Sequence, residues 1–189
     1  MTIIVALHDL VAGTWIGADS RATRAQSHIM PVVCRKWYRR GNVALAAAGD
    51  GKAQDLIEWA APHGLLEPAD ALMVAAKLQA IVKADGWKGN AGERGVEDYG
   101  SSFILATLAG VWDIDGSFAV SRINDGEMWA RGSGMSFALG AGHALCRDKR
   151  RREVYPEARI EAALNTAARF DAACGGPMFI EKLGSPAGG

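Results

Sequence analysis

Five consecutive apolar residues near the start of the chain, Ile3 to Leu7, constrain the fold more than any other segment. A strand with one face in water alternates apolar and polar residues, whereas an unbroken apolar strand is covered on both faces. We therefore expect this strand inside a sheet that has a packed layer on each side. The rest of the chain must supply those layers.

The order of the remaining predicted elements meets that requirement. Groups of strands alternate with pairs of helices, which indicates an α+β fold and not a strict β-α-β alternation. Pro68 is expected in the first turn of the second helix. The predicted strands cover residues 2–7, 14–18, 36–39, 43–48, 102–108, 111–115, 117–122, 127–130 and 177–182, and the predicted helices cover 50–61, 68–84, 134–146 and 156–173.

The length of 189 residues fits one domain, which we place at residues 1–183, followed by a flexible Gly/Pro-rich tail at 184–189. The 21 basic and 21 acidic residues leave no net charge, which argues against a general nucleic-acid binder. No apolar run approaches the roughly 20 residues that cross a bilayer. We expect neither nucleic acid nor a membrane among the partners.

The three cysteines, Cys34, Cys146 and Cys174, form no CxxC pair. This odd number favours neither a disulfide framework nor a zinc site, and the N-terminus lacks the pattern of a signal peptide. We therefore expect a reducing, cytoplasmic location.

Thr2 follows the initiator methionine, and removal of methionine before a small residue is common. Removal exposes an α-amino group with a pKa of roughly 7.7–8.0, which is neutral often enough to act as a base toward the hydroxyl of the same residue. The alternative is an exposed N-terminus without a role.

Three motifs and a lysine follow one another along the chain: Thr2-Ile-Ile-Val-Ala, then Gly17-Ala-Asp-Ser-Arg-Ala-Thr, then Lys36, then Gly132-Ser-Gly. In this order the chain resembles the proteasome β-subunit family from Thr2 to about Leu183. That family is a branch of the N-terminal-nucleophile hydrolases and includes the bacterial HslV protease and bacterial proteasome homologues. The resemblance implies a four-layer αββα sandwich and a threonine endopeptidase that needs no cofactor or metal.

The resemblance also implies catalytic roles for five residues. Thr2 matches the nucleophile, Lys36 the catalytic lysine, and Asp19 the acidic residue that holds this lysine charged and in place. A neighbouring ammonium lowers the pKa of the threonine hydroxyl and disfavours protonation of the terminal amine. Ser133 matches a serine that hydrogen-bonds near the terminal amine, and Asp171 matches a supporting aspartate.

Two positions depart from the family pattern. Cys174 stands where the family has a serine, and a thiol is a weaker hydrogen-bond donor; the alternative is a core thiol without a role. Ala46 stands where the family has a glycine whose backbone N–H helps to form the oxyanion hole, and alanine keeps that N–H. Gly49 is the alternative oxyanion residue in a different register.

By the same matching, four small residues fall near the pocket for the residue before the scissile bond, which predicts a preference for medium or large apolar side chains. These residues are Ala22, Cys34, Ala44 and Ala48.

The expected assembly is a homo-oligomer of stacked rings whose active sites face an inner chamber. Such a chamber admits only unfolded polypeptides, so an ATP-dependent unfoldase is an expected partner. Residues 86–100 are expected to line a pore or a ring contact. Since only Met1 precedes Thr2, we expect no propeptide, as in the short-form bacterial relatives.

Two other functions remain open from the sequence. A catalytically inactive, ring-forming structural subunit of the same fold would keep Met1 or block the amine. An N-terminal-nucleophile amidase for a small molecule would not need a ring of subunits.

Overall fold

The computed structural model describes residues 2–24, 28–33, 35–91, 96–147 and 155–184. Met1, Cys34, most of the predicted tail and part of the 86–100 segment lie outside the described residues. The strands are β1 (Ile3–Asp9), β2 (Gly13–Asp19), β3 (Arg21–Arg24), β4 (His28–Val33), β5 (Trp37–Arg40), β6 (Val43–Ala48), β7 (Asn90–Ala91), β8 (Glu97–Asp98), β9 (Ser102–Thr107), β10 (Gly110–Ile114), β11 (Val120–Arg122), β12 (Met128–Gly132) and β13 (Met178–Lys182). The helices are α1 (Gly51–Ala60), the 3₁₀ turn η1 (Ala61–His63), α2 (Ala71–Ala84), α3 (Met135–Arg147) and α4 (Pro156–Phe170).

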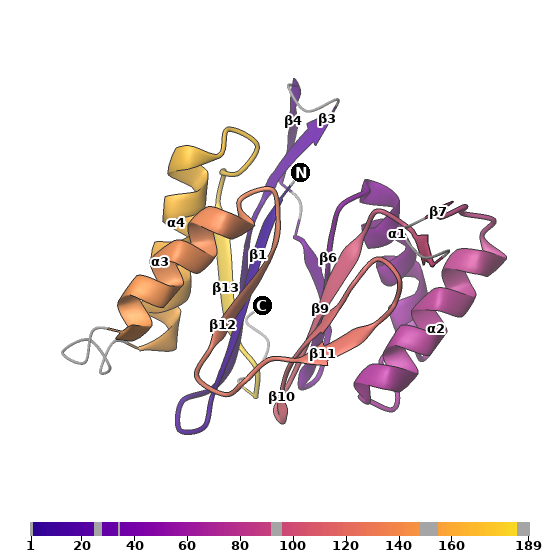
Figure 1. The fold of residues 1–189 in the computed structure, drawn as a ribbon, viewed down its shortest axis with the longest axis horizontal. Helices are drawn as coiled ribbons and strands as arrows, with labels where there is room; N and C mark the ends of the chain where they lie inside the picture. Colours follow the sequence, from indigo (N-terminus) through magenta and orange to yellow (C-terminus); the bar gives the residue numbers. More distant parts are fainter. Residues whose placement is uncertain (1, 25–27, 34, 92–95, 148–154, 185–189) are drawn as a thin grey trace.

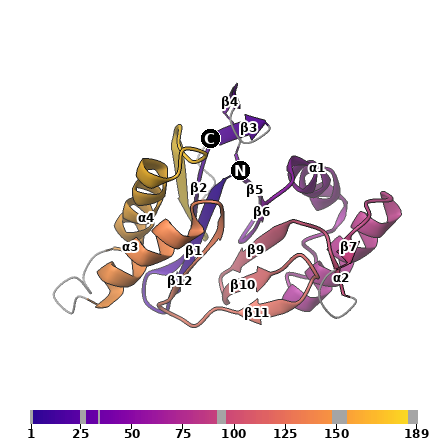
Figure 2. The same ribbon diagram turned by 45° about the horizontal axis from the view of Figure 1, so that its top comes forward.

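Two antiparallel sheets form the centre of the molecule. One has the strand order β12-β1-β2-β13 and the other has the order β11-β10-β9-β6-β5. Helices α3 and α4 cover the first sheet on one side of the molecule, and α1 and α2 cover the second sheet on the other side (Figure 1). The β3–β4 hairpin projects beyond the sheets, close to the N-terminus (Figures 1 and 2). None of the described helices has the length and apolar character needed to cross a membrane.

Strand β1 confirms the prediction of a strand covered on both faces. Ile3, Val5 and Leu7 pack in one apolar cluster with residues of α3 and α4. Ile4 and Ala6 point the other way, into a cluster that lies between the two sheets. The alternation follows from the two-residue period of a strand, which here has an apolar layer on each side.

Strand β6 repeats this arrangement in the second sheet. Ala44, Ala46 and Ala48 face the layer between the sheets, whereas Leu45 and Ala47 face the layer under α1 and α2. The strand is central in its sheet because it pairs with β5 on one side and with β9 on the other. The strand ends at Ala48, at the rim between the two sheets, where the candidate site lies.

The structure differs from the predicted elements at several termini. Helix α4 ends at Phe170 because Asp171 adopts an extended conformation and accepts a hydrogen bond from the N–H of Ala173 at 2.9 Å. Helix α2 begins after Pro68, because Asp70 caps it by accepting from the N–H of Met73 at 2.9 Å. The β3–β4 hairpin and the short β7–β8 pair were not predicted, and β11 is shorter than its predicted strand.

Candidate active site

Thr2 lies immediately before β1 and is only 4% exposed. Its hydroxyl donates a hydrogen bond of 2.8 Å to Oδ1 of Asp19. The antiparallel register that pairs Ile4 with Ala18 brings the end of β2 beside the start of β1. The hairpin between these strands therefore places the predicted nucleophile against the predicted acidic residue.

Asp19 is completely buried and accepts three hydrogen bonds from two segments of the chain. Besides the Thr2 hydroxyl, Oδ1 accepts from the N–H of Ile3 at 3.0 Å. The other oxygen, Oδ2, accepts from the N–H of Gly175 at 2.9 Å, in the loop after α4. A buried carboxylate needs such partners, and here they fix its position between the two chain segments.

Lys36 is also buried, with 8% exposure, but it has a different partner from the predicted one. Its ammonium donates to the carbonyl oxygen of Arg21 at 2.8 Å, and no contact found among the described residues joins it to Asp19. The oxygens of Asp19 accept from Thr2, Ile3 and Gly175, and β3, which starts at Arg21, brings its carbonyl to the lysine instead.

Arg21 also ties the loop after α4 to this end of β2. Its N–H donates to the carbonyl of Gly175 at 3.0 Å, and its guanidinium donates through Nη1 to the carbonyl of Ala172 at 2.7 Å. This loop carries the next two predicted site residues, Asp171 and Cys174. Arg21 stands within the second of the motifs, but no role was predicted for it.

Ser133, Asp171 and Cys174 form a second polar group beside Asp19. The thiol of Cys174 donates to Oδ2 of Asp171 at 3.4 Å and lies 3.8 Å from the hydroxyl oxygen of Ser133. Burial acts to raise the pKa of Asp171, but hydrogen bonds from Ser133, the N–H of Ala173 and Cys174 outweigh it and hold this pKa below its ordinary value. The carboxylate is therefore ionised at neutral pH.

The thiol of Cys174 remains protonated in this environment. Burial, followed by the negative charge of Asp19, raises its pKa to about 12. Cys174 is fully buried and also belongs to the apolar cluster under α3 and α4. Cys174 is thus a core thiol that also has polar partners, and its supporting role stays a prediction.

Gly132 allows β12 to approach the nucleophile. Its φ is +114°, a conformation that residues with a side chain rarely adopt, and an added Cβ would lie 1.9 Å from the carbonyl oxygen of Thr2. The glycine of the Gly132-Ser-Gly motif thus has a steric role, and it places Ser133 next to Thr2.

A cavity of about 460 Å³ opens in front of Thr2. Ser133 lies in its wall beside the nucleophile, and Ala48 and Gly49 come from the end of β6. Gly49, with a φ of +122°, turns the chain from β6 toward α1. The cavity therefore lies between the two sheets at the rim where β1, β6 and β12 come together.

The structure brings only some of the predicted pocket and oxyanion residues to this cavity. Ala48 and Gly49 line it, whereas Ala44 and Ala46 are completely buried deeper in the layer between the sheets. Of the two oxyanion alternatives, Gly49 is the one at the cavity. Ala22 is half-buried on β3 and does not line the cavity, and Cys34 lies outside the described residues.

Sequence reasoning missed the charged residues of the cavity wall, Asp98, Asp115 and Arg131. Asp115 precedes a glycine and was interpreted only as a hairpin turn. The three residues come from different strands or turns, and neither spacing nor periodicity connects them. Only the sheet topology shows that they share one cavity.

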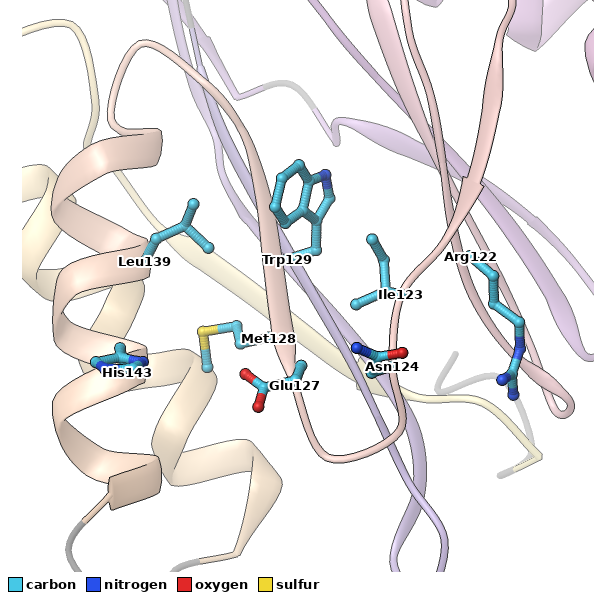
Figure 3. Close-up of a pocket in the computed structure, with 8 residues that line it drawn as sticks. All are labelled: Arg122, Ile123, Asn124, Glu127, Met128, Trp129, Leu139 and His143. Carbon is cyan, nitrogen blue, oxygen red and sulfur yellow. The ribbon is translucent and has the colours of Figure 1, made fainter.

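A second cavity, of about 320 Å³, lies between α3 and the connection from β11 to β12 (Figure 3). Ile123, Met128, Trp129 and Leu139 give it apolar walls, and His143 lies at its edge on α3. None of the predicted site residues lines this cavity.

No protein-family profile matches the chain, and no curated protein sequence matches it. Solved structures do match. BPH from Thiobacillus denitrificans, in complex with epoxomicin, is 20% identical with a TM-score of 0.72, over 98% of this chain and 100% of its own. HslV from Trypanosoma brucei is 17% identical with a TM-score of 0.66, over 95% and 98% of the two chains. An Anbu (Gly-1) mutant from Hyphomicrobium sp. strain MC1 is 15% identical with a TM-score of 0.70, over 95% and 80%.

These neighbours are proteasome-type N-terminal-nucleophile hydrolases, so the predicted resemblance is confirmed at the level of the fold. The chain is a mixed α and β protein with two antiparallel sheets and the fold of that group.

Proposed function

We propose that this chain is a threonine endopeptidase that hydrolyses peptide bonds of unfolded polypeptides, with Thr2 as its N-terminal nucleophile. The observation that carries the proposal is the hydroxyl of Thr2, which is held by the buried Asp19 at the edge of a cavity. The shared fold supports the same assignment, and so do two residues that matched the family motifs: Asp19 accepts from this hydroxyl, and Ser133 lines the same cavity as Thr2.

In the proposed reaction, Oγ1 of Thr2 attacks the carbonyl carbon of the scissile peptide bond and loses its proton to a base. The negative oxygen of the tetrahedral intermediate is stabilised by backbone N–H groups, for which Gly49 is the candidate at the cavity. The intermediate expels the amine, which takes up the proton, and leaves an ester on Thr2. Water then hydrolyses the ester and restores the hydroxyl.

Two groups in the site can accept the proton of the Thr2 hydroxyl. The first is the α-amino group of Thr2 itself, which is free only after the residue before it has been removed. The second is Asp19, which already accepts a hydrogen bond from the hydroxyl at 2.8 Å. A base with the pKa of an α-amino group gives a rate that rises between about pH 7 and 8.5, whereas a carboxylate gives no such rise.

The buried residues next to Thr2 have supporting roles in this proposal. The ammonium of Lys36, held by the Arg21 carbonyl, favours the ionised form of the threonine oxygen and the neutral form of the amine. Asp171, Cys174 and Ser133 form the polar group that positions the amine side of the site.

The proposal extends to the architecture and the assembly. We interpret the two sheets and their helical layers as the four-layer αββα sandwich of the N-terminal-nucleophile hydrolases, in one domain at 1–183. We further propose that copies of the chain stack as rings in the cytoplasm and receive substrates from an ATP-dependent unfoldase. The balanced charge and the cysteine content of the sequence support this location.

The test combines an intact mass with a hydrolysis assay. Protein that begins at Thr2 is expected to cleave a fluorogenic peptide and reduced casein, and a peptide epoxyketone is expected to modify both the hydroxyl and the amine of Thr2. Thr2→Ala is the matched control, because methionine is also removed before alanine, and it is expected to lose at least about a thousandfold in rate.

Hydrolysis by Thr2→Ala at the rate of the parent protein would contradict the nucleophile assignment. Correctly trimmed rings that cleave nothing would instead support the inactive structural subunit. A monomer or dimer that hydrolyses only small amides would support the small-molecule amidase.

A further inference from the structure

The wall of the cavity in front of Thr2 contains three ionisable side chains among the described residues, Asp98, Asp115 and Arg131. The cavity is already defined by the nucleophile that lines it. The charges of its wall therefore influence which substrate side chain fits there. For each charged group, the partners within the protein decide how much of its charge remains for a substrate.

The positive charge of Arg131 is neutralised by Asp113. Its Nε donates to Oδ1 of Asp113 at 2.6 Å, and its Nη2 donates to Oδ2 of the same carboxylate. Asp113 is 6% exposed and also accepts from the indole N–H of Trp129 at 2.9 Å. Such a two-pronged pair is short and strong, so Asp113 balances most of the positive charge of Arg131, although this charge still acts on Asp115.

Asp115 uses only one of its two oxygens in hydrogen bonds with the described residues. Its Oδ1 accepts from the N–H and the hydroxyl of Ser117 at 2.8 and 2.6 Å and from the N–H of Ala119 at 3.1 Å. Its Oδ2 has no partner among the described residues. These hydrogen bonds, together with the charge of Arg131, lower the pKa of Asp115 despite its burial, so the group is ionised at neutral pH.

Asp98, which lies against the turn at Gly116, also uses only one of its two oxygens in hydrogen bonds with the described residues. Its Oδ1 accepts from the N–H of Gly100 at 2.7 Å, and Oδ2 has no partner among the described residues. The carboxylate packs directly on Gly116, where an added Cβ would lie 2.2 Å from Oδ1. Asp98 and Asp115 are thus brought to one place by the close approach of their neighbouring backbones.

We infer that this cavity selects a substrate side chain with a positive charge, lysine or arginine, whose aliphatic stem lies along Ala48 and whose charged end lies between Asp98 and Asp115. Among the described residues, the wall holds two carboxylates that each have one oxygen without a partner, while its one cation is already paired. Lysine and arginine have an apolar stem and a charged end, which matches a cavity whose wall contains both alanine and glycine and two carboxylates.

This inference rests on the proposed function, because that proposal makes the substrate a polypeptide. It also changes the predicted preference for apolar side chains, which was based on Ala22, Cys34, Ala44 and Ala48. Of the three that the structure describes, Ala22, Ala44 and Ala48, only Ala48 lines the cavity. The acidic residues that do line it were not part of the earlier prediction.

The test measures binding without catalysis. In the full-length Thr2→Ala chain, fluorescence anisotropy is used to follow labelled, N-acetylated peptides in which one position is lysine, norleucine or glutamate, scanned along the peptide. Acetylation removes the α-ammonium, and one peptide with a free N-terminus and no lysine reports binding through that group instead.

At one position we expect lysine to bind about tenfold more tightly than norleucine, and glutamate more weakly than both. The difference is expected to shrink as salt is raised from 0.05 to about 0.5 M, because screening weakens exposed charge pairs. Asp115→Asn and Asp98→Asn are each expected to reduce the preference for lysine about threefold or more. Asparagine keeps the accepting oxygen of each turn, so both variants are expected to fold like the parent.

Asp55→Asn is the matched control. Asp55 is exposed on α1, so this substitution removes the same charge at a place away from the cavity. It is expected to leave the preference unchanged. Equal binding of lysine and norleucine at every position would overturn the inference, and so would a lysine preference that survives both cavity variants. If the preference holds but trimmed protein with Thr2 cleaves no peptide, charge selection stands and the endopeptidase proposal fails.

Discussion

Thr2 lies between two surroundings with opposite properties. Behind it, Asp19, Lys36, Asp171 and Cys174 form what we name the rear wall, in which each polar group donates to or accepts from another part of the chain. In front of it, Ala48, Asp98 and Asp115 form the front wall, in which two carboxylate oxygens have no partner among the described residues. The polar groups of the rear wall have partners within the chain, whereas the front wall has an exposed and a partly buried carboxylate that can each accept from solvent or from a ligand.

The difference indicates where function and specificity are encoded. A change in the rear wall removes a partner from a buried group, so it is expected to act on the nucleophile and on stability. A change in the front wall leaves no buried group unpaired, and it is expected to act on the choice of substrate. The following predictions test this division, from the largest expected effect to the smallest.

Lys36→Ala removes the one buried ammonium that the resemblance places in the mechanism. We expect the rate of peptide hydrolysis to fall by about a hundredfold or more, because the threonine oxygen loses its cationic neighbour. Steady-state kinetics with an uncharged peptide measure this loss. Lys83→Ala, an exposed lysine on α2 away from the cavity, is the control and should behave like the parent. If the rate of Lys36→Ala stayed within threefold of the rate of the parent, Lys36 would have no part in the reaction.

Gly132→Ala tests the contact between β12 and the nucleophile. An alanine Cβ would lie 1.9 Å from the Thr2 carbonyl oxygen, so β12 or the N-terminus must move. We expect the free energy of unfolding to fall by about 2–4 kcal/mol, measured by urea denaturation. Gly140→Ala on α3 meets no atom within 4 Å, and it is expected to stabilise the protein by up to about 1 kcal/mol. Similar stabilities for the two variants would show that β12 does not constrain Thr2.

Asp171→Asn tests how much the charge of one rear-wall carboxylate contributes to the stability of the fold. The pKa of Asp171 is lower in the folded protein than in the unfolded chain, so its charge stabilises the fold above the ordinary aspartate pKa. This contribution is lost as the pH falls through that value toward the lower, folded-state pKa. Because Asp171 is half-exposed, we expect at most about 1 kcal/mol. Urea denaturation between pH 3 and 6 should show a smaller acid loss for Asp171→Asn than for the parent.

Cys174→Ser is expected to have the smallest effect. A hydroxyl can make the same hydrogen bonds to Asp171 and Ser133 and is a stronger donor, so activity should change by no more than about threefold. In the parent protein, the pKa of about 12 keeps the thiol protonated, and we expect iodoacetamide at pH 8 to leave Cys174 unmodified in peptide mapping. Rapid alkylation at that pH would show that the rear wall is open to solvent.

The sequence was sufficient for the layers around the first strand and for naming Thr2 and Asp19, but not for pairing them. The apolar run at Ile3–Leu7 predicted the layers on both faces of β1, because local periodicity determines that feature. Thr2 and Asp19 were named through the family resemblance, which paired Asp19 with Lys36, whereas the hairpin between β1 and β2 brings Asp19 beside Thr2.

The partner of Lys36 and the front wall could not be predicted in the same way. Lys36 donates to a backbone carbonyl of β3, a strand that the sequence did not indicate. Asp98 and Asp115 meet because Gly116 leaves room for a carboxylate, and that depends on how β8 and the end of β10 approach each other. Backbone partners and long-range contacts of this kind carry no local pattern in the sequence.

The hydrogen bond from the N–H of Gly175 to Asp19 has a consequence for the order in which this part of the molecule forms during synthesis. Asp19, which accepts from the hydroxyl of Thr2, lies 156 residues before Gly175 in the sequence. A nascent chain therefore cannot satisfy both oxygens of Asp19 until Gly175 has been made. The start of β1 and the end of β2 have to wait for the loop after α4 before their buried carboxylate is fully held.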